Sequence, residues 1–258
     1  MTEKSPFREA TDFMVDINQY LLDFGQVLNN QVRRIATYFE INCYNNAVRF
    51  YQNQDFEITM INPDSGNGNF VYQLSPAGNP NNFSFFLARK DYQENGKKFT
   101  VICSIRQNVR VQSKSDNNIF FTPDIVISHF FEDQTQSEIS SDQNLSFYQN
   151  QKQKFYFIAN ENLITFAEAK HYSPFPELIG SFIGIVHVLK PDFLRKNKRK
   201  KKGNHFAPSL LISGEGANHV SQIKTSFENR YAINILFELI SDGSQLYERE
   251  KIKKLNKF

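Results

Sequence analysis

The chain has 258 residues, enough to bury a substantial core as one large α/β domain or two small ones. The amino terminus lacks the basic and apolar regions of a signal peptide, and no stretch approaches the roughly 18 apolar residues of a membrane span. Cys43 and Cys103 lie in apolar patterns without metal-ligand spacing, so both are predicted to be small buried side chains. These features predict a cytoplasmic protein without membrane attachment.

Helical periodicity opens the chain. Apolar residues recur at spacings of three and four from Thr11 to about Gln52, which predicts one long amphipathic helix, or two helices broken near Asn29-Asn30. Short β-rich runs follow, separated by turns rich in Asn, Pro and Gly. They predict an antiparallel meander with strands at Phe56 to Ile61, Phe70 to Leu74, Phe83 to Ala88 and Phe99 to Val111.

The middle of the chain alternates between apolar strands and polar sequence. A strand is predicted from Phe120 to Ile127, and Asp124 stands inside it. The stretch from Glu132 to Lys154 is rich in Gln, Ser and Asn and is predicted to be a surface insertion. Strand character returns at Phe155 to Ile158 and at Leu163 to Lys170.

A helix, a strand and a second helix are predicted next. The segment from Leu178 to Leu189 is apolar on nearly every side and is predicted to be a buried helix, with Gly180 and Gly184 on a face that approaches a sheet closely. A buried strand from Pro208 to Ser213 and a long helix from about Asn218 to Ile240 follow. Strand, buried helix and strand form a parallel crossover. We therefore predict an α/β fold in which helices flank a central mixed sheet.

Three charged residues stand within the predicted strands. Glu168 and Lys170 are two residues apart at a strand end, so both side chains are predicted to point the same way. Asp124 lies among apolar residues, where an unpaired carboxylate would be unfavourable. If the two strands are neighbours, two carboxylates and an ammonium converge, as metal-assisted cleavage of a phosphodiester requires. The alternative is a structural ion pair at the end of a sheet.

Pro123-Asp124, Glu168-Ala169-Lys170 and the order of the elements resemble the PD-(D/E)XK nuclease superfamily, which has the restriction-endonuclease-like fold. The resemblance extends from about Thr11 to Ile240. It implies that Asp124 and Glu168 hold one or two Mg²⁺ ions, for which Mn²⁺ would substitute. It also implies that Lys170 orients or activates the attacking water and stabilises negative charge.

Further residues are candidates for the same site. The backbone carbonyl of Ala169 lies between the two functional side chains and is a candidate metal ligand. Some members of the superfamily add an acid from the first helix, and Glu40 is the candidate here. The alternative for Glu40 is a solvated position on a helix face. His171 and Tyr172 follow the motif directly and either line the same cleft or serve in packing.

A basic segment follows the predicted buried helix. Eight basic residues and one acid lie between Lys190 and Lys202, although the net charge of the whole chain is only +3. This segment is either a phosphate-binding element, a solvated loop, or both. The turn from Ser213 to Gly216 could cradle a phosphate, with an ordinary turn as the alternative. The candidate nucleic-acid contacts are Lys196, Lys198, Arg199, Lys200, Lys201 and Lys224.

We therefore predict a single nuclease domain over residues 1–258, with the polar insertion at about 132–154 and a basic loop at about 190–205. The expected activity is Mg²⁺-dependent hydrolysis of phosphodiester bonds, with DNA as the favoured substrate and endonucleolytic cleavage as the favoured mode. An RNA-cleaving nuclease and a non-catalytic nucleic-acid-binding or assembly module are the alternatives. The many aromatic residues follow core spacings, and a homodimer is left open.

Overall fold

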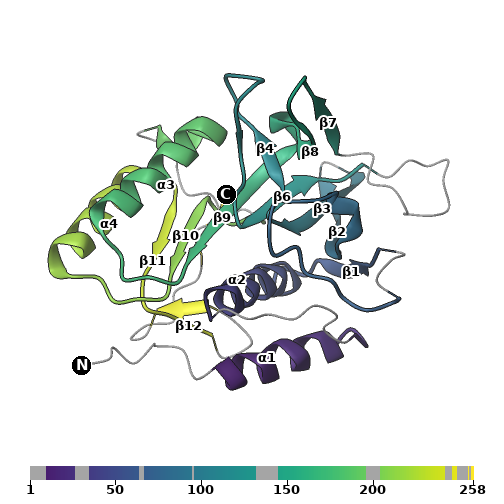
Figure 1. The fold of residues 1–258 in the computed structure, drawn as a ribbon, viewed down its shortest axis with the longest axis horizontal. Helices are drawn as coiled ribbons and strands as arrows, with labels where there is room; N and C mark the ends of the chain where they lie inside the picture. Colours follow the sequence, from purple (N-terminus) through teal and green to yellow (C-terminus); the bar gives the residue numbers. More distant parts are fainter. Residues whose placement is uncertain are drawn as a thin grey trace.

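A mixed seven-stranded β-sheet with helices on both faces forms the middle of the structure (Figure 1). The computed structural model describes residues 10–26, 35–63, 67–94, 96–131, 145–195, 204–241, 246–248, 255 and 257–258. Four α-helices lie within this part of the chain. The architecture is therefore α/β with a mixed sheet, as predicted.

One half of the main sheet is antiparallel. It contains β1 (Glu57–Ile61), β2 (Phe85–Glu94), β3 (Lys97–Gln107), β6 (Ile125–His129) and β9 (Leu163–Lys170), in this spatial order. The meander is thus confirmed for β1 to β3. The predicted strand at Phe70 to Leu74 is wrong, because this segment is not a strand and instead places Phe70 and Tyr72 in the core, with ring centroids 4.5 Å apart.

The other half of the sheet is parallel. β10 (Ser209–Ile212) pairs with β9, and β11 (Asn234–Leu236) pairs with β10. This confirms the parallel crossover. The last predicted helix, however, ends at Arg230 rather than near Ile240, because the apolar run that follows forms β11 and then β12 (Leu239–Ser241), which pairs with β13 (Leu246–Glu248). A short, fully buried run suits a parallel strand.

Two predicted strands are divided between the main sheet and a second sheet. The second sheet has the order β5 (Phe120–Phe121), β4 (Arg110–Gln112), β8 (Lys154–Ile158) and β7 (Ser146–Gln149). The run Phe99 to Val111 breaks between β3 and β4 at Asn108, whose φ of 49° is left-handed. The run Phe120 to Ile127 breaks before Asp124, at Pro123, which cannot donate to a ladder.

Part of the predicted insertion forms a strand that the sequence did not predict. Ser146 to Gln149 form β7, which pairs with β8 at the edge of the second sheet. Residues 132–144 lie outside the described residues.

Helices cover both faces of the main sheet (Figure 1). α1 (Ala10–Leu22) and α2 (Ile35–Gln52) lie on one face, so the amino-terminal helical pattern forms two helices rather than one. α3 (Pro176–Leu189) and α4 (Asn218–Arg230) lie on the other face. No helix among the described residues has the length and apolar character needed to cross a membrane.

α3 buries only one face, which corrects the predicted burial of the whole helix. The ring of Phe182 packs against Phe166 of β9 at a centroid distance of 6.2 Å. Gly180 and Gly184 are exposed, and nothing lies within 4 Å of a Cβ built at either position. These glycines therefore do not provide the predicted close approach to a sheet. The buried side chains of α3 are Ile179, Phe182, Val186 and Leu189.

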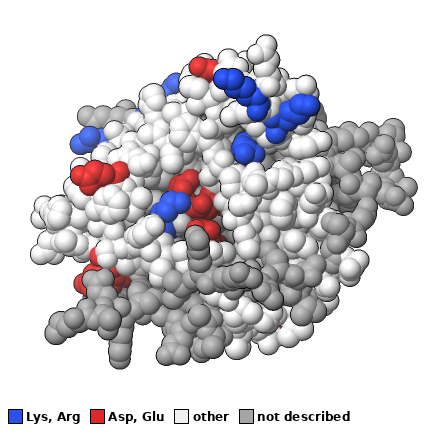
Figure 2. All heavy atoms as spheres, viewed as in Figure 1, with Lys and Arg blue, Asp and Glu red and all other residues white. Residues whose placement is uncertain are grey.

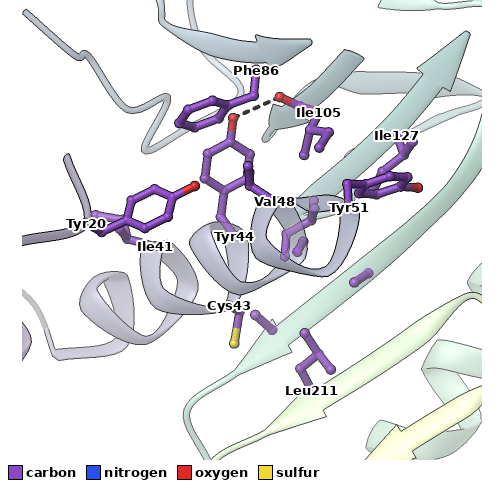
Figure 3. Packing of buried hydrophobic residues seen from close by; sticks show 14 of the residues in the cluster. Tyr20, Ile41, Cys43, Tyr44, Val48, Tyr51, Phe86, Ile105, Ile127 and Leu211 are labelled. Atoms are coloured by element: carbon purple, nitrogen blue, oxygen red, sulfur yellow. Dashed lines mark hydrogen bonds between the residues drawn. The ribbon is translucent and has the colours of Figure 1, made fainter. Parts of the chain in front are cut away.

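α2 is fixed on the antiparallel half by buried side chains (Figure 3). The hydroxyl of Tyr44 donates to the carbonyl oxygen of Ile105 in β3 at 2.8 Å. Cys43 and Cys103 are fully buried in the same cluster, as predicted. Since Glu40 precedes Tyr44 by four residues, the two side chains share a helix face. The packing of Tyr44 therefore turns Glu40 toward the sheet.

Candidate active site

The two strands that carry the predicted site are neighbours. β6 and β9 pair antiparallel, with Ile125 opposite Ala167. Asp124 directly precedes β6, so it meets β9 at Glu168 and Ala169. The prediction that Asp124 lies inside a strand is wrong, because Asp124 belongs to the short segment between β5 and β6. This position lets its Oδ2 accept a hydrogen bond from the Ala169 amide at 2.7 Å.

Lys170 lies between two carboxylates. Its Nζ is 2.7 Å from Oδ2 of Asp124 and 2.9 Å from Oε2 of Glu168, so Glu168 and Lys170 point the same way, as predicted. The side chains of Lys170, Asp124 and Glu168 are 28%, 12% and 9% exposed. Solvent therefore reaches the group chiefly at the lysine. Figure 2 shows one place near the middle of the drawn face where acidic and basic atoms meet.

Burial and like charge disfavour ionisation of Glu168. Burial raises the pKa of Glu168 and the charge of Asp124 raises it further, while Lys170 opposes both effects. Burial by itself lowers the pKa of Lys170, but attraction to Glu168 and Asp124 outweighs it, so this pKa is raised. Lys170 therefore stays protonated, and one cation faces two carboxyl groups.

Glu40 is a third acid at the same place. Its pKa is raised to about 7, first by burial and then by the charge of Asp124, whereas Lys170 lowers it. These effects require Glu40 to lie within electrostatic range of both residues. Glu40 is also half-buried, which disagrees with the alternative of a solvated position on a helix face.

The donor set suits a small, hard cation. Within the described ranges, no group of three or more His, Cys, Asp or Glu side chains could hold a metal ion. Mg²⁺ commonly uses only one or two carboxylates and completes its shell with water and substrate oxygens, and Asp124 and Glu168 match this smaller set. A strand residue directs its N–H and C=O to the same neighbour. The carbonyl of Ala169 therefore lies on the Asp124 side, like its amide.

The predicted nucleic-acid contacts do not gather at this site in the described residues. Lys224 is on α4, and its ammonium lies 5.2 Å from the ring centre of Phe237, which follows β11. The other five candidates all belong to the basic segment and lie outside the part of the chain that the structure describes: Lys196, Lys198, Arg199, Lys200 and Lys201.

The glycines of the Ser213 to Gly216 turn are explained by packing. A Cβ at Gly214 would lie 2.4 Å from the carbonyl oxygen of Tyr172, and a Cβ at Gly216 would lie 2.7 Å from the ring of Phe237. Both contacts are shorter than real Cβ atoms allow. The composition of this turn therefore needs no bound phosphate, which favours the ordinary-turn alternative.

His171 and Tyr172 differ in their environments. His171 packs against Phe39 of α2 with ring centroids 5.9 Å apart, so it serves in packing. Tyr172 is 65% exposed, and Phe175, before α3, is 46% exposed. The sequence left Tyr172 undecided and gave no indication for Phe175. The sequence feature that could have identified both residues as candidates was their position between the Glu-x-Lys strand and the next helix.

Comparison of the chain with protein-family models, with curated proteins and with solved structures returns no match. The chemistry of the site therefore has to be inferred from its own residues.

Proposed function

We propose that the chain is a metal-dependent nuclease that hydrolyses phosphodiester bonds, with DNA as the favoured substrate. The observation that carries this proposal is the convergence of Asp124, Glu168 and Lys170 where two neighbouring strands meet. The mixed sheet between helical layers and the acid on α2 support placing the chain in the PD-(D/E)XK superfamily, with the restriction-endonuclease-like fold.

Each residue has a role that follows from its chemistry. Asp124 and Glu168 would hold Mg²⁺ with the Ala169 carbonyl as a further ligand, and Glu40 would act on the site through its charge. The chemistry that Mg²⁺ would supply there is polarisation of the phosphodiester and a lower pKa for the attacking water. Lys170 stays protonated, so its ammonium can orient that water and stabilise the negative charge that develops on the phosphate oxygens. In the net reaction the water oxygen would bond to phosphorus and one P–O bond would break, and the proton that the water gives up would be balanced by the one that the leaving oxygen takes.

A purely structural ion pair explains the charges less well. One lysine needs only one carboxylate, yet Lys170 contacts two and Glu40 lies near them. The raised pKa values of Glu168 and Glu40 show that ionising these acids is unfavourable in the folded protein. Acids held in this way are typical of functional sites, and a divalent cation would favour their ionised forms.

The test is incubation of plasmid DNA, single-stranded DNA and RNA with the purified chain, in Mg²⁺, in Mn²⁺ or in chelator. We expect cleavage only with metal, and a loss of about 100-fold or more in rate for Glu168→Gln and for Lys170→Ala. Matched controls are Glu161→Gln, an exposed acid before β9, and Lys90→Ala, a lysine paired with Asp55 at 3.6 Å. Both controls should cut at the parental rate.

Cleavage that survives Glu168→Gln and Lys170→Ala, or that persists in chelator, contradicts the proposal. Binding of nucleic acid without cleavage in any metal favours the non-catalytic alternative. Cleavage of RNA alone favours the RNA-specific one.

A further inference from the structure

Two aromatic side chains are exposed on the connection that follows the Glu-x-Lys strand. Tyr172 is 65% and Phe175 is 46% exposed, although most large apolar side chains lie in the hydrophobic clusters. Both belong to the short connection between β9 and α3. Tyr172 follows Lys170 by two residues, so their Cα atoms are at most about 7 Å apart. A substrate at Lys170 would therefore lie near the start of this connection.

The main chain of this connection is fixed by the turn after β10. The amide of Ser213 donates to the Lys170 carbonyl at 3.2 Å, and the amide of Gly214 donates to the Tyr172 carbonyl at 3.1 Å. The missing Cβ of Gly214 permits this approach, because a Cβ there would lie 2.4 Å from the Tyr172 oxygen and 2.7 Å from Cα of Ser173. The ring of Tyr172 thus projects from an ordered backbone, which lowers the entropic cost of a contact with a ligand.

Phe175 stands where a polar residue is expected. It is the N-cap of α3, a position that favours Ser, Thr, Asp or Asn, and it makes no side-chain capping hydrogen bond. At 46% exposed, Phe175 also leaves much of its ring outside the core. Exposure alone does not distinguish Phe175, because Phe147 on β7 is similarly exposed. Its position in the connection that follows the Glu-x-Lys strand is what favours contact with a ligand.

We propose that Tyr172 and Phe175 stack on unpaired bases of a nucleic-acid strand whose phosphate lies at Asp124, Glu168 and Lys170. This inference rests on the proposed function and specifies its substrate class. Every base has a π-face, so aromatic stacking tolerates any sequence. A base can present its face only when it is unstacked, as in single strands, frayed ends and unpaired junctions. The preferred substrate is therefore single-stranded or locally unpaired nucleic acid rather than intact duplex.

The test measures binding separately from cleavage. Fluorescence anisotropy with labelled single-stranded DNA, single-stranded RNA and duplex DNA of equal length is measured in chelator. Tyr172→Leu should weaken single-strand binding by about 5- to 100-fold, the range for one lost stacking contact. Tyr172→Phe keeps the ring and should bind like the parent. The matched control is Phe147→Leu, because Phe147 is 51% exposed on β7 of the second sheet.

An abasic scan locates the contact. One abasic position in the single strand should weaken binding to the parent and leave binding to Tyr172→Leu unchanged, because the ring and the base are lost from the same contact. The arms with DNA and RNA distinguish the two sources of an unpaired base. Phe175→Leu should also weaken single-strand binding, and the abasic position that no longer affects its binding should be a neighbouring one.

The outcomes separate the two proposals. Equal single-strand binding by the parent and Tyr172→Leu, or an equal loss in Phe147→Leu, overturns the stacking proposal even if the chain cleaves DNA. Tighter parental binding to duplex than to single strands overturns it as well. A selective loss of binding in Tyr172→Leu supports stacking. If no substrate is cut in any metal, the nuclease assignment is overturned, but this binding result still supports stacking.

Discussion

Lys170 is the residue on which the charge balance of the site depends. It donates to both Asp124 and Glu168, and at neutral pH it is the cation that holds these acids together in the absence of metal. The lysine therefore stabilises the fold and is also the cation proposed for catalysis. The two roles respond differently to pH, which makes them separable.

The first prediction concerns the loss of this ammonium. Lys170→Met should lower the unfolding free energy by about 2 kcal/mol at pH 8, because charged hydrogen bonds to two carboxylates are lost and the like charges face each other. The loss should shrink at pH 5, where the raised pKa values of Glu168 and Glu40 leave these acids largely protonated. Urea denaturation in chelator measures the change in unfolding free energy at each of the two pH values.

Lys90→Met is the control for this prediction. Lys90 donates to the Gln54 carbonyl and pairs with Asp55, and neither partner belongs to the group around Lys170, so its loss should cost the same at pH 5 and at pH 8. The same pH dependence for the two lysines, or a loss at Lys170 that does not change with pH, would contradict the charge balance described for the site.

The residues of the motif were easier to predict than their surroundings. Alternation along Leu163 to Lys170 was sufficient to place Glu168 and Lys170 on one side, because the period of a strand is a local property. The break before Asp124 was not predicted, because β5 joins the second sheet only through β4, a partner eight or more residues earlier. Pro123 belongs to the Pro-Asp motif, but it also has no N–H to donate, so the hydrogen bonds between strands cannot continue through it.

Among the elements, α3 shows how composition can mislead. Its sequence is apolar on nearly every side, but the helix lies over the sheet with one buried row and exposes Gly180, Gly184 and His187. Hydrophobicity alone did not reveal which face meets the sheet. The long helix predicted to Ile240 failed for a similar reason, since the run from Ala232 to Phe237 is short and apolar and fits either a strand or a helix.

The second prediction uses the exposed glycines of α3. Gly180→Ala and Gly184→Ala should each raise the unfolding free energy by about 0.5–1 kcal/mol, because alanine loses less backbone entropy in a helix and its Cβ meets no atom within 4 Å. The thermal midpoint should rise by about 2–4 °C per kcal/mol for a chain of this size.

Gly214→Ala is the matched opposite case. Its Cβ would collide with backbone atoms of Tyr172 and Ser173, so we expect destabilisation of about 1–3 kcal/mol. If Gly180→Ala destabilised the protein instead, the outer face of α3 would have to be covered by something in solution, and the exposed position assigned to Gly180 would be wrong.

At the scale of the whole molecule, the coarse fold was predictable and the number of sheets was not. The order of helical and strand patterns predicted an α/β protein with a mixed sheet, because each pattern is local and the crossover rule fixes its direction. The second sheet pairs β4 with β8, which lie more than forty residues apart in the chain. No local pattern encodes that pairing, and the polar sequence of β7 resembled a loop.

The acids of the site also connect metal binding to global stability. In the absence of metal, the folded pKa of Glu40 is about 7 and that of Glu168 is raised, against about 4.3 for an unfolded glutamate. Between these values the folded chain binds more protons than the unfolded chain, so these two groups lower the unfolding free energy as the pH rises through this window. His205 acts in the opposite direction, because burial lowers its pKa to about 4.

The third prediction compares the parent with Glu168→Gln. His205 contributes equally to the unfolding free energy of both proteins, so its effect drops out of the difference. In chelator at pH 8, Glu168→Gln should be more stable than the parent, by on the order of 1 kcal/mol, because it removes an acid whose ionisation in the folded state is unfavourable. The difference should disappear near pH 5, where Glu168 in the parent is protonated.

Added Mg²⁺ should reverse that order. A ligand that binds only the folded state stabilises it by RT ln(1 + [L]/Kd), or about 1.4 kcal/mol at ten times Kd. The parent should gain this stability at pH 8, and Glu168→Gln, which lacks a carboxylate, should gain little. Glu161→Gln, which changes an exposed acid, should follow the parent in chelator and in Mg²⁺. Thermal denaturation of the three proteins in both conditions measures the reversal. If Mg²⁺ stabilised the parent and Glu168→Gln equally, the acids at the end of β9 would not be metal ligands, and their raised pKa values would reflect burial alone.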